Sequence, residues 1–174
     1  MSTGVRTGLA ELRTAVAEVP DPEIPVLTIA DLGILRDVRW AADGRPEVVL
    51  TPTYSGCPAT EAIRSDVTAR AHAVRPDARV VVELAPAWTT DWITEAGRQK
   101  LAAYGIAPPS GNAAHGGSGR PGKVALTLGR PPAIGCPRCG SSDTELLSRF
   151  GSTPCKALRR CRSCAEPFDE FKPL

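Results

Sequence analysis

The sequence is poor in aromatic residues and histidine, and it contains no long hydrophobic run. Aromatic side chains make up 5% of the 174 residues, so a core has to be built from Val, Leu, Ile and Ala. No apolar stretch approaches the roughly 20 residues that a transmembrane helix needs. The two histidines, His72 and His115, are not placed to serve as a fixed general base for a nucleophile. These absences argue against a membrane protein and against a cysteine–histidine hydrolase.

The sequence also lacks a strong net charge and an export signal. The formal net charge of +2 is too small to indicate a polyanionic partner by itself. Residues Met1 to Gly8 are polar and lack the apolar centre of a signal peptide. A Gly-rich phosphate loop and a helix with paired carboxylates are missing as well. We therefore expect a cytoplasmic protein that is not an enzyme in its own right, and whose cysteines are metal ligands or redox thiols rather than disulfides.

Hydrophobic periodicity over the first hundred residues predicts a small two-layer domain of the α/β (α+β) class. Apolar residues recur at helical spacing, and Asp43-Gly44 is a hairpin signal between two β-rich runs. The second helix is expected to begin at Cys57 or Pro58. The predicted elements are a helix over 9–19, strands over 34–40 and 47–51, a helix with the apolar stripe Ala59, Ile63, Val67 and Ala71, a strand over 79–84, and a helix over 94–104 capped by Gly105.

The composition changes abruptly near residue 107. Residues 107–123 are rich in Gly, Pro and Ser and show no periodicity, which is typical of a flexible linker. A short strand is expected over 124–128. The predicted organisation is a first domain over 1–106, a linker over 107–123 and a second domain over 124–174.

Five of the six cysteines lie in the last 39 residues, and four of them form two Cys-x-x-Cys turns. The turns are Cys136-Pro-Arg-Cys139 and Cys161-Arg-Ser-Cys164, separated by 21 residues, close to the spacing of about 15–20 that is typical of zinc sites. A strand is expected over 144–150, and it would form part of a hairpin between the two turns. The sequence therefore predicts a structural Zn²⁺ held by four thiolates in a zinc ribbon. Two metal-free dithiols and an iron–sulfur cluster are the alternatives.

Cys155 is left over from these pairs. It lies among Lys156, Arg159 and Arg160, which favour a thiolate, so it is either a buried structural cysteine or a substitute ligand. From Cys136 onward seven Lys and Arg stand against five Asp and Glu. Because four thiolates around Zn²⁺ add about −2, this domain is near neutral and a nucleic-acid partner is not expected.

Cys57 stands alone in the segment Thr53-Tyr-Ser-Gly-Cys57-Pro. A cysteine at the start of a helix faces unpaired N–H groups, which lower its pKa and make the thiolate available. A nucleophile, a redox thiol, a metal ligand and a small buried residue all remain open from the residues alone. Asp21 and Glu23 are the acids of a loop framed by prolines, where turn formation is the plain interpretation.

Several motifs together resemble the metal–sulfur cluster assembly domain family. In the tail, further segments resemble a branch of that family that carries a C-terminal zinc ribbon and belongs to the bacterial phenylacetyl-CoA oxygenase system. The family motifs are Asp21-Pro-Glu-Ile-Pro25, Asp31-Leu-Gly33, Thr53 to Pro58, Trp88-Thr-Thr-Asp-Trp92 and Gly105 to Pro109; those of the tail are Cys136 to Cys139, Phe150 to Thr153, Cys155 to Leu158 and Glu166 to Phe168.

The resemblance implies an accessory role in phenylacetate catabolism. The expected function is iron–sulfur cluster assembly or maturation of the phenylacetyl-CoA oxygenase complex, whose reductase subunit carries flavin and an iron–sulfur cluster and is the expected client. The resemblance also implies that Cys57 is the functional thiol, which contacts a transient cluster or the client, and that Asp21 and Glu23 lie near it and shape the same cluster- or client-binding pocket. Oxygenase subunits are the expected partners, with a homodimer as a further option. The alternatives are a non-chemical adapter and a thiol-redox protein that uses Cys57 with Cys155.

Overall fold

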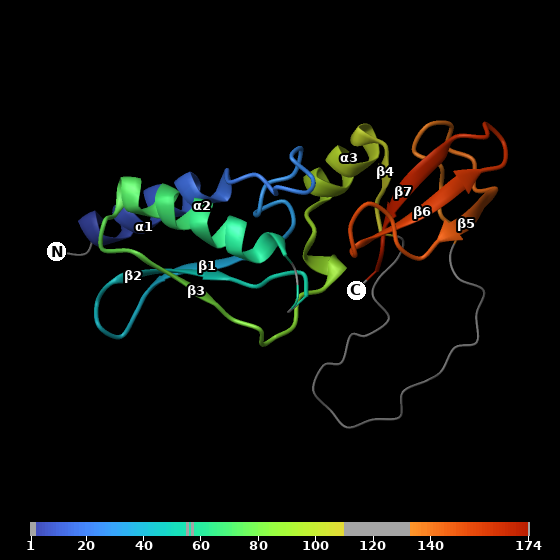
Figure 1. The fold of residues 1–174 in the computed structure, drawn as a ribbon. Coiled ribbons are helices and arrows are strands. Elements are labelled where there is room, and N and C mark those ends of the chain that lie inside the picture. Colours follow the sequence, from blue (N-terminus) through green and yellow to red (C-terminus); the bar gives the residue numbers. More distant parts are fainter. Residues whose placement is uncertain (1–2, 55, 57, 110–132, 174) are drawn as a thin grey trace, which may run out of the picture. The chain divides into compact units, whose positions relative to one another are not determined.

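The computed structural model describes residues 3–54, 56, 58–109 and 133–173, with the side chains of the first helix described from residue 8 onward. The chain divides into two compact units, Met1–Lys100 and Leu101–Leu174, which are described separately (Figure 1). The first is a mixed α+β unit and the second is a small sheet that carries the tail cysteines, as the sequence predicts. No helix in the described part of the chain is both long and apolar enough to cross a bilayer.

In the first unit, two helices cover one face of a three-stranded sheet (Figure 1). The helices are α1 (Thr3–Ala17) and α2 (Ala59–Val74), and the strands β1 (Leu35–Trp40), β2 (Pro46–Leu50) and β3 (Arg79–Val82) lie in the order β1-β2-β3. β1 and β2 form the predicted antiparallel hairpin, with Gly44 at φ +81° in its turn. β3 returns parallel to β2 after α2, a crossover that places α2 on the sheet.

The predicted apolar stripe of α2 is confirmed, because Ala59, Ile63, Val67 and Ala71 are its buried residues. Residues four positions apart share one face of a helix, and this face packs on the sheet. The helix itself begins at Ala59, one or two residues later than predicted, although Pro58 already has helical φ and ψ. The proline that was expected as the first helical residue is therefore the residue just before it.

The central strand β2 is buried along its whole length, including Glu47, which is 5% exposed. Arg39 on β1 and Arg79 on β3 each place a guanidinium nitrogen 2.8 Å from its carboxylate. Burial raises the pKa of Glu47, but the hydrogen bonds from Arg39 and Arg79 outweigh it, so the net pKa is lowered. A row of opposite charges thus ties the three strands together at this level of the sheet.

The second unit is a four-stranded sheet in the order β4-β7-β6-β5. After η1 (Thr90–Trp92), α3 (Glu95–Tyr104) leads through Gly105, at φ +93°, into β4 (Ile106–Ala107). β4 pairs parallel with β7 (Pro167–Phe171), which pairs antiparallel with β6 (Lys156–Cys161), and β5 (Thr144–Ser148) closes the other edge. Ile106, the last residue of the predicted first domain, and Ala107, the first residue of the predicted linker, therefore belong to the ribbon sheet.

The predicted linker over 107–123 and strand over 124–128 fall mostly on residues 110–132, which lie outside the described part of the chain. The domain boundaries 1–106, 107–123 and 124–174 thus stay a prediction.

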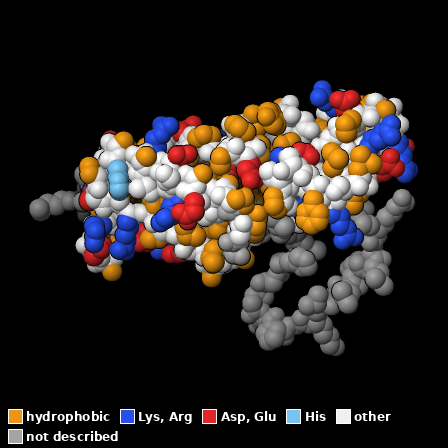
Figure 2. All heavy atoms as spheres, in the orientation of Figure 1, with side chains coloured by type: hydrophobic (Ala, Val, Ile, Leu, Met, Phe, Trp, Pro, Cys, Tyr) orange, Lys and Arg blue, Asp and Glu red, His pale blue; other side chains and the backbone are white. Residues whose placement is uncertain are grey.

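The face of the molecule in Figure 2 shows acidic and basic side chains interspersed on both units, and no continuous basic surface on that face.

Candidate metal centre and thiol loop

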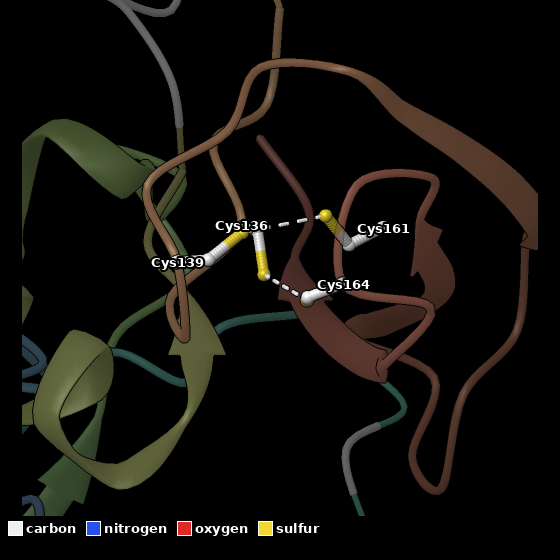
Figure 3. Close-up of side chains that lie close together, drawn as sticks. All are labelled: Cys136, Cys139, Cys161 and Cys164. Carbon is white, nitrogen blue, oxygen red and sulfur yellow. Dashed lines mark hydrogen bonds between the residues drawn. The ribbon is translucent and has the colours of Figure 1, made fainter.

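Four cysteines of the second unit bring their sulfur atoms together, all within 4.8 Å of one another. Figure 3 shows the cysteine side chains of the two Cys-x-x-Cys turns facing one another. The Cys136 and Cys164 sulfurs lie 3.8 Å apart and those of Cys139 and Cys161 lie 3.5 Å apart. These distances exclude disulfide bonds, whose S–S length is about 2.05 Å. Among the described residues, this is the one group of three or more potential ligands gathered closely enough to hold a metal ion.

The two turns repeat the same backbone geometry. In each turn the first cysteine donates its N–H to the carbonyl five residues later: Cys136 to Ser141 at 2.9 Å and Cys161 to Glu166 at 3.0 Å. In each, the residue four positions after the first cysteine has a positive φ, which is +74° at Gly140 and +63° at Ala165. A hydrogen bond of 2.7 Å between the hydroxyls of Ser141 and Ser163 joins the two turns. The site is therefore a pair of matched turns facing each other.

Backbone N–H groups converge on these sulfurs and favour thiolates. The N–H of Cys164, with that of Ser163, lowers the pKa of Cys161 to about 6 in spite of burial. The N–H of Ser141 acts in the same direction on Cys139, but hydrogen bonding with Cys161 and burial raise the pKa of Cys139 to about 12. Such closely spaced thiols lose their protons together when a cation takes the protons' place.

One side of the centre is buried and the other faces solvent. Cys136 and Cys161 are 2% and 0% exposed and pack in an apolar cluster with Ala107, Ile134 and Phe168. Cys139 and Cys164 are exposed. Ala107 is on β4, so the first residue of the predicted linker contributes to the apolar wall behind the sulfurs. No sequence signal indicated this strand, because two residues are too few for a period.

Cys155 lies outside this group of four ligands. It is 8% exposed and its sulfur lies 3.0 Å from the Thr153 hydroxyl. Of the two roles that the sequence leaves open for Cys155, this burial favours a structural cysteine.

In the first unit, Asp21 shapes the predicted loop rather than projecting from it. Its side chain is 7% exposed, and one carboxylate oxygen accepts the N–H groups of Glu23 at 2.9 Å and Ile24 at 2.8 Å. Asp21 N–H in turn donates to Leu27 O at 2.8 Å, which closes the loop. Glu23 lies within this turn and is half-buried. Asp21 therefore performs the turn-forming role that was the plain interpretation of the motif.

Asp31 joins two segments of the first unit by hydrogen bonds. The residue belongs to one of the family motifs, but the sequence did not predict this structural role. Its side chain accepts hydrogen bonds from the Thr28 N–H at 3.0 Å and from the Lys100 ammonium at 2.6 Å. Burial raises the pKa of Asp31, but the hydrogen bonds from Lys100 and Thr28 together hold it below its ordinary value. Asp31 O also accepts the N–H of Thr94, just before α3. This residue fixes the loop over 28–34 to the start of α3.

The motif around Trp88 and Trp92 packs on the same loop. Trp88 donates its indole N–H to Leu32 O at 2.9 Å, and the Arg36 guanidinium stacks on Trp92 at 3.4 Å from the ring centroid. Gly33 has φ +69°, and a Cβ there would lie 2.5 Å from Trp92 O. Only glycine fits this position, because the conformation and the close approach both exclude a side chain.

Cys57 lies outside the described residues, so its predicted role as the functional thiol is untested. The described residues do show where its loop starts: Thr51 donates its N–H to Ile34 O at 2.9 Å, next to Gly33. The predicted contact of Cys57 with Asp21 and Glu23, and its pairing with Cys155, stay predictions.

Comparison with known proteins gives a consistent family assignment for both halves of the chain. Residues 9–84 match the family described as "Iron-sulfur cluster assembly protein", and residues 120–172 match the "PaaD zinc beta ribbon domain". An Escherichia coli (strain K12) protein, named as one of the subunits of a "Putative 1,2-phenylacetyl-CoA epoxidase", is 48% identical over 166 residues, which cover 93% of this chain and 91% of the relative.

Two further relatives match the first unit. A Porphyromonas gingivalis protein named "Fe-S protein maturation auxiliary factor" is 38% identical over 79 residues, covering 44% of this chain and 74% of the relative. A solved structure of a domain of unknown function, DUF59, from Bacillus anthracis is 25% identical, with a TM-score of 0.49, and covers 55% of this chain and 92% of that one.

Proposed function

This chain belongs to the PaaD family of 1,2-phenylacetyl-CoA epoxidase subunits, and we propose on that basis that it is an accessory protein that assists iron–sulfur cluster assembly in the epoxidase complex. The observation that carries the proposal is the union, in one chain, of an iron–sulfur cluster assembly domain with a ribbon that presents four convergent sulfurs. The kinship with a maturation auxiliary factor supports an accessory rather than a catalytic role.

The ribbon holds a structural Zn²⁺ through Cys136, Cys139, Cys161 and Cys164. Around a single tetrahedral ion with Zn–S bonds near 2.3 Å, neighbouring sulfurs lie about 3.8 Å apart. The sulfur pairs at 3.8 and 3.5 Å support this fit. A cluster of several iron atoms would need to sit between the thiolates and hold them farther apart, so a single ion suits this geometry better. All four positions are occupied by protein, which leaves none for a substrate.

In this proposal the protein on which the chain acts is the reductase subunit of the epoxidase. Cys57 contacts either the iron–sulfur cluster or a thiol of that subunit. In this scheme Asp21 and Glu23 shape the neighbouring loop, and the zinc centre keeps the ribbon folded for docking. The close packing of Gly33 on Trp92, next to the hydrogen bond between Ile34 and Thr51, supports a rigid platform at the start of the Cys57 loop.

The test is a pair of matched cysteine variants, Cys57→Ser and Cys155→Ser, in cells that make the epoxidase subunits. We expect Cys57→Ser to keep its zinc while the reductase loses most of its iron and acid-labile sulfide. Cys155→Ser should leave the reductase loaded. A fully loaded reductase beside the Cys57→Ser variant would exclude the thiol role and favour the adapter function, in which only ribbon variants disturb the complex.

A further inference from the structure

The end of β5 exposes three large apolar side chains within five consecutive positions. Leu146 is 47% exposed, Leu147 is 51% exposed and Phe150, in the turn that follows, is 71% exposed. Scattered apolar residues are normal on a protein surface, but a cluster of large ones is a mark of an interaction site. We name this region, together with Arg149 and Lys172, the β5 tip.

The β5 tip is held in place by its own contacts. The Lys172 ammonium lies 5.0 Å from the centroid of the Phe150 ring and donates to Arg149 O at 3.3 Å. Phe150 N–H donates to the Ser148 hydroxyl at 3.1 Å, and Gly151 N–H donates to Lys156 O at 2.8 Å. These contacts order the backbone of the turn that carries the ring before any partner arrives, which lowers the entropy cost of binding.

Most of the ribbon cations that form no ion pair with a described residue lie at this tip. All five acids between residues 136 and 173 form ion pairs with four of its seven cations, which leaves three cations over: Arg149, Arg160 and Lys172. Two of these three belong to the β5 tip, and neither forms an ion pair with a described residue. A complementary surface therefore has to offer both apolar side chains and carboxylates.

The geometry disfavours two other occupants. A second copy of the chain that met this tip through a two-fold axis would bring the cations of both copies together. Addition of a strand to the free edge of β5 is hindered by the bulge between Leu146 and Ser148, a feature that protects edge strands from pairing. A different protein that docks through its side chains avoids both the repulsion between like charges and the hindered strand pairing.

We propose that the β5 tip is the surface through which the ribbon binds another subunit of the epoxidase complex, by an apolar patch bordered by carboxylates on that subunit. This inference rests on the proposed function for the identity of the partner, but the surface is assigned from the exposure and charge of this chain. Phe150 is the central anchor, and Arg149 and Lys172 guide the approach.

The test measures binding of the full-length zinc-loaded chain to each purified epoxidase subunit. We expect Phe150→Ser to weaken binding by about tenfold or more, as for an anchor residue at the centre of an interface. The matched control is Tyr104→Ser, since Tyr104 is 56% exposed in the same unit and outside the tip. Zinc content and unfolding temperature should be unchanged in both variants, because both side chains are exposed.

Charge reversal gives a second, independent measurement. Arg149→Glu should weaken binding several-fold at low salt and have little effect at about 0.5 M salt, where screening acts over a few ångströms. Arg70→Glu, on the exposed side of α2, makes the same change in net charge and should bind like the unmodified chain.

The outcomes separate the two proposals. If the unmodified chain binds a subunit and Phe150→Ser binds it equally well, the β5 tip is not the docking surface and the proposed function stands. If the unmodified chain binds none of the subunits, the proposed function fails and the inference with it. If the chain is a dimer in sedimentation equilibrium and Phe150→Ser is a monomer, the tip pairs with itself and the inference is wrong.

Discussion

The two units of this chain are each stabilised internally by a different kind of interaction. Among the described residues, ten of the twelve largest fully buried side chains lie in Met1–Lys100, and the other two, Leu101 and Phe171, lie in the second unit. The second unit instead buries the sulfurs of Cys136 and Cys161. A small unit cannot bury enough apolar surface to offset the entropy of ordering its chain, so it needs an additional constraint. The first unit is therefore stabilised mainly by packing, and we predict that the second unit needs a metal ion at its four sulfurs.

Removal of the metal should have the largest effect and should separate the units most clearly. Structural zinc sites contribute about 10–16 kcal/mol of binding free energy that is also folding free energy. We therefore expect a strong chelator to unfold the ribbon sheet and leave the first unit folded. All three tryptophans, Trp40, Trp88 and Trp92, lie in the first unit, so their fluorescence reports on that unit alone.

The measurement follows tryptophan emission and zinc release, by a colorimetric indicator, in the same titration. Cys161→Ser should reproduce the effect of the chelator, while Cys155→Ser should retain zinc. A shift of tryptophan emission that accompanies zinc loss would mean that the first unit also depends on the metal, and the contrast between the units would be lost.

A cavity in the first unit should destabilise that unit and leave zinc binding by the second unit unchanged. Leu27 is 0% exposed, and Leu27→Ala removes buried methyl groups at a cost of about 3 kcal/mol. We expect the urea midpoint of tryptophan fluorescence to fall while the zinc affinity stays the same. Leu84→Ala makes the same chemical change at a side chain that is 57% exposed, and it should shift the midpoint little. Equal loss of zinc affinity with Leu27→Ala would show that the units are energetically coupled.

The sequence allowed the elements of the first unit and the four candidate ligands to be predicted, because both rest on short-range patterns. The stripe from Ala59 to Ala71 has a helical period, and each pair of cysteines is fixed by one turn. The roles of Asp31 and β4 were not predicted. Asp31 acts through Lys100, 69 positions away, and β4 is a two-residue strand that pairs with β7 from the far end of the chain. Such contacts depend on the tertiary fold and leave no local signal.

Asp21 illustrates a different limit. Its residue type and its place among prolines made turn formation the plain interpretation, and only the family resemblance implied a binding role beside Cys57. The structure shows both N–H groups of the turn bonded to one carboxylate oxygen, which assigns the side chain to the turn. Its predicted contact with a cluster or client stays open because Cys57 lies outside the described residues.

The smallest predicted effect concerns the difference between the two cysteine turns. Both need a residue at positive φ, but the first turn has Gly140 there and the second has Ala165. A non-glycine residue in this conformation costs roughly 1–2 kcal/mol. Glycine would remove that strain, but it also makes the unfolded chain more flexible, at a cost of about 0.4–1 kcal/mol. We therefore expect Ala165→Gly to stabilise the ribbon slightly.

The measurement is zinc retention against a competing chelator, with Gly140→Ala as the mirror variant. Gly140→Ala should lose zinc at a lower chelator concentration than the unmodified chain, and Ala165→Gly at a slightly higher one. No atom of the described residues lies within 4 Å of the position that a Cβ at Gly140 would take, so strain in the backbone is the cause that this substitution isolates. If Ala165→Gly lost zinc more readily, the alanine methyl group would be contributing to the second turn, and the two turns would be alike in backbone geometry but not in what stabilises it.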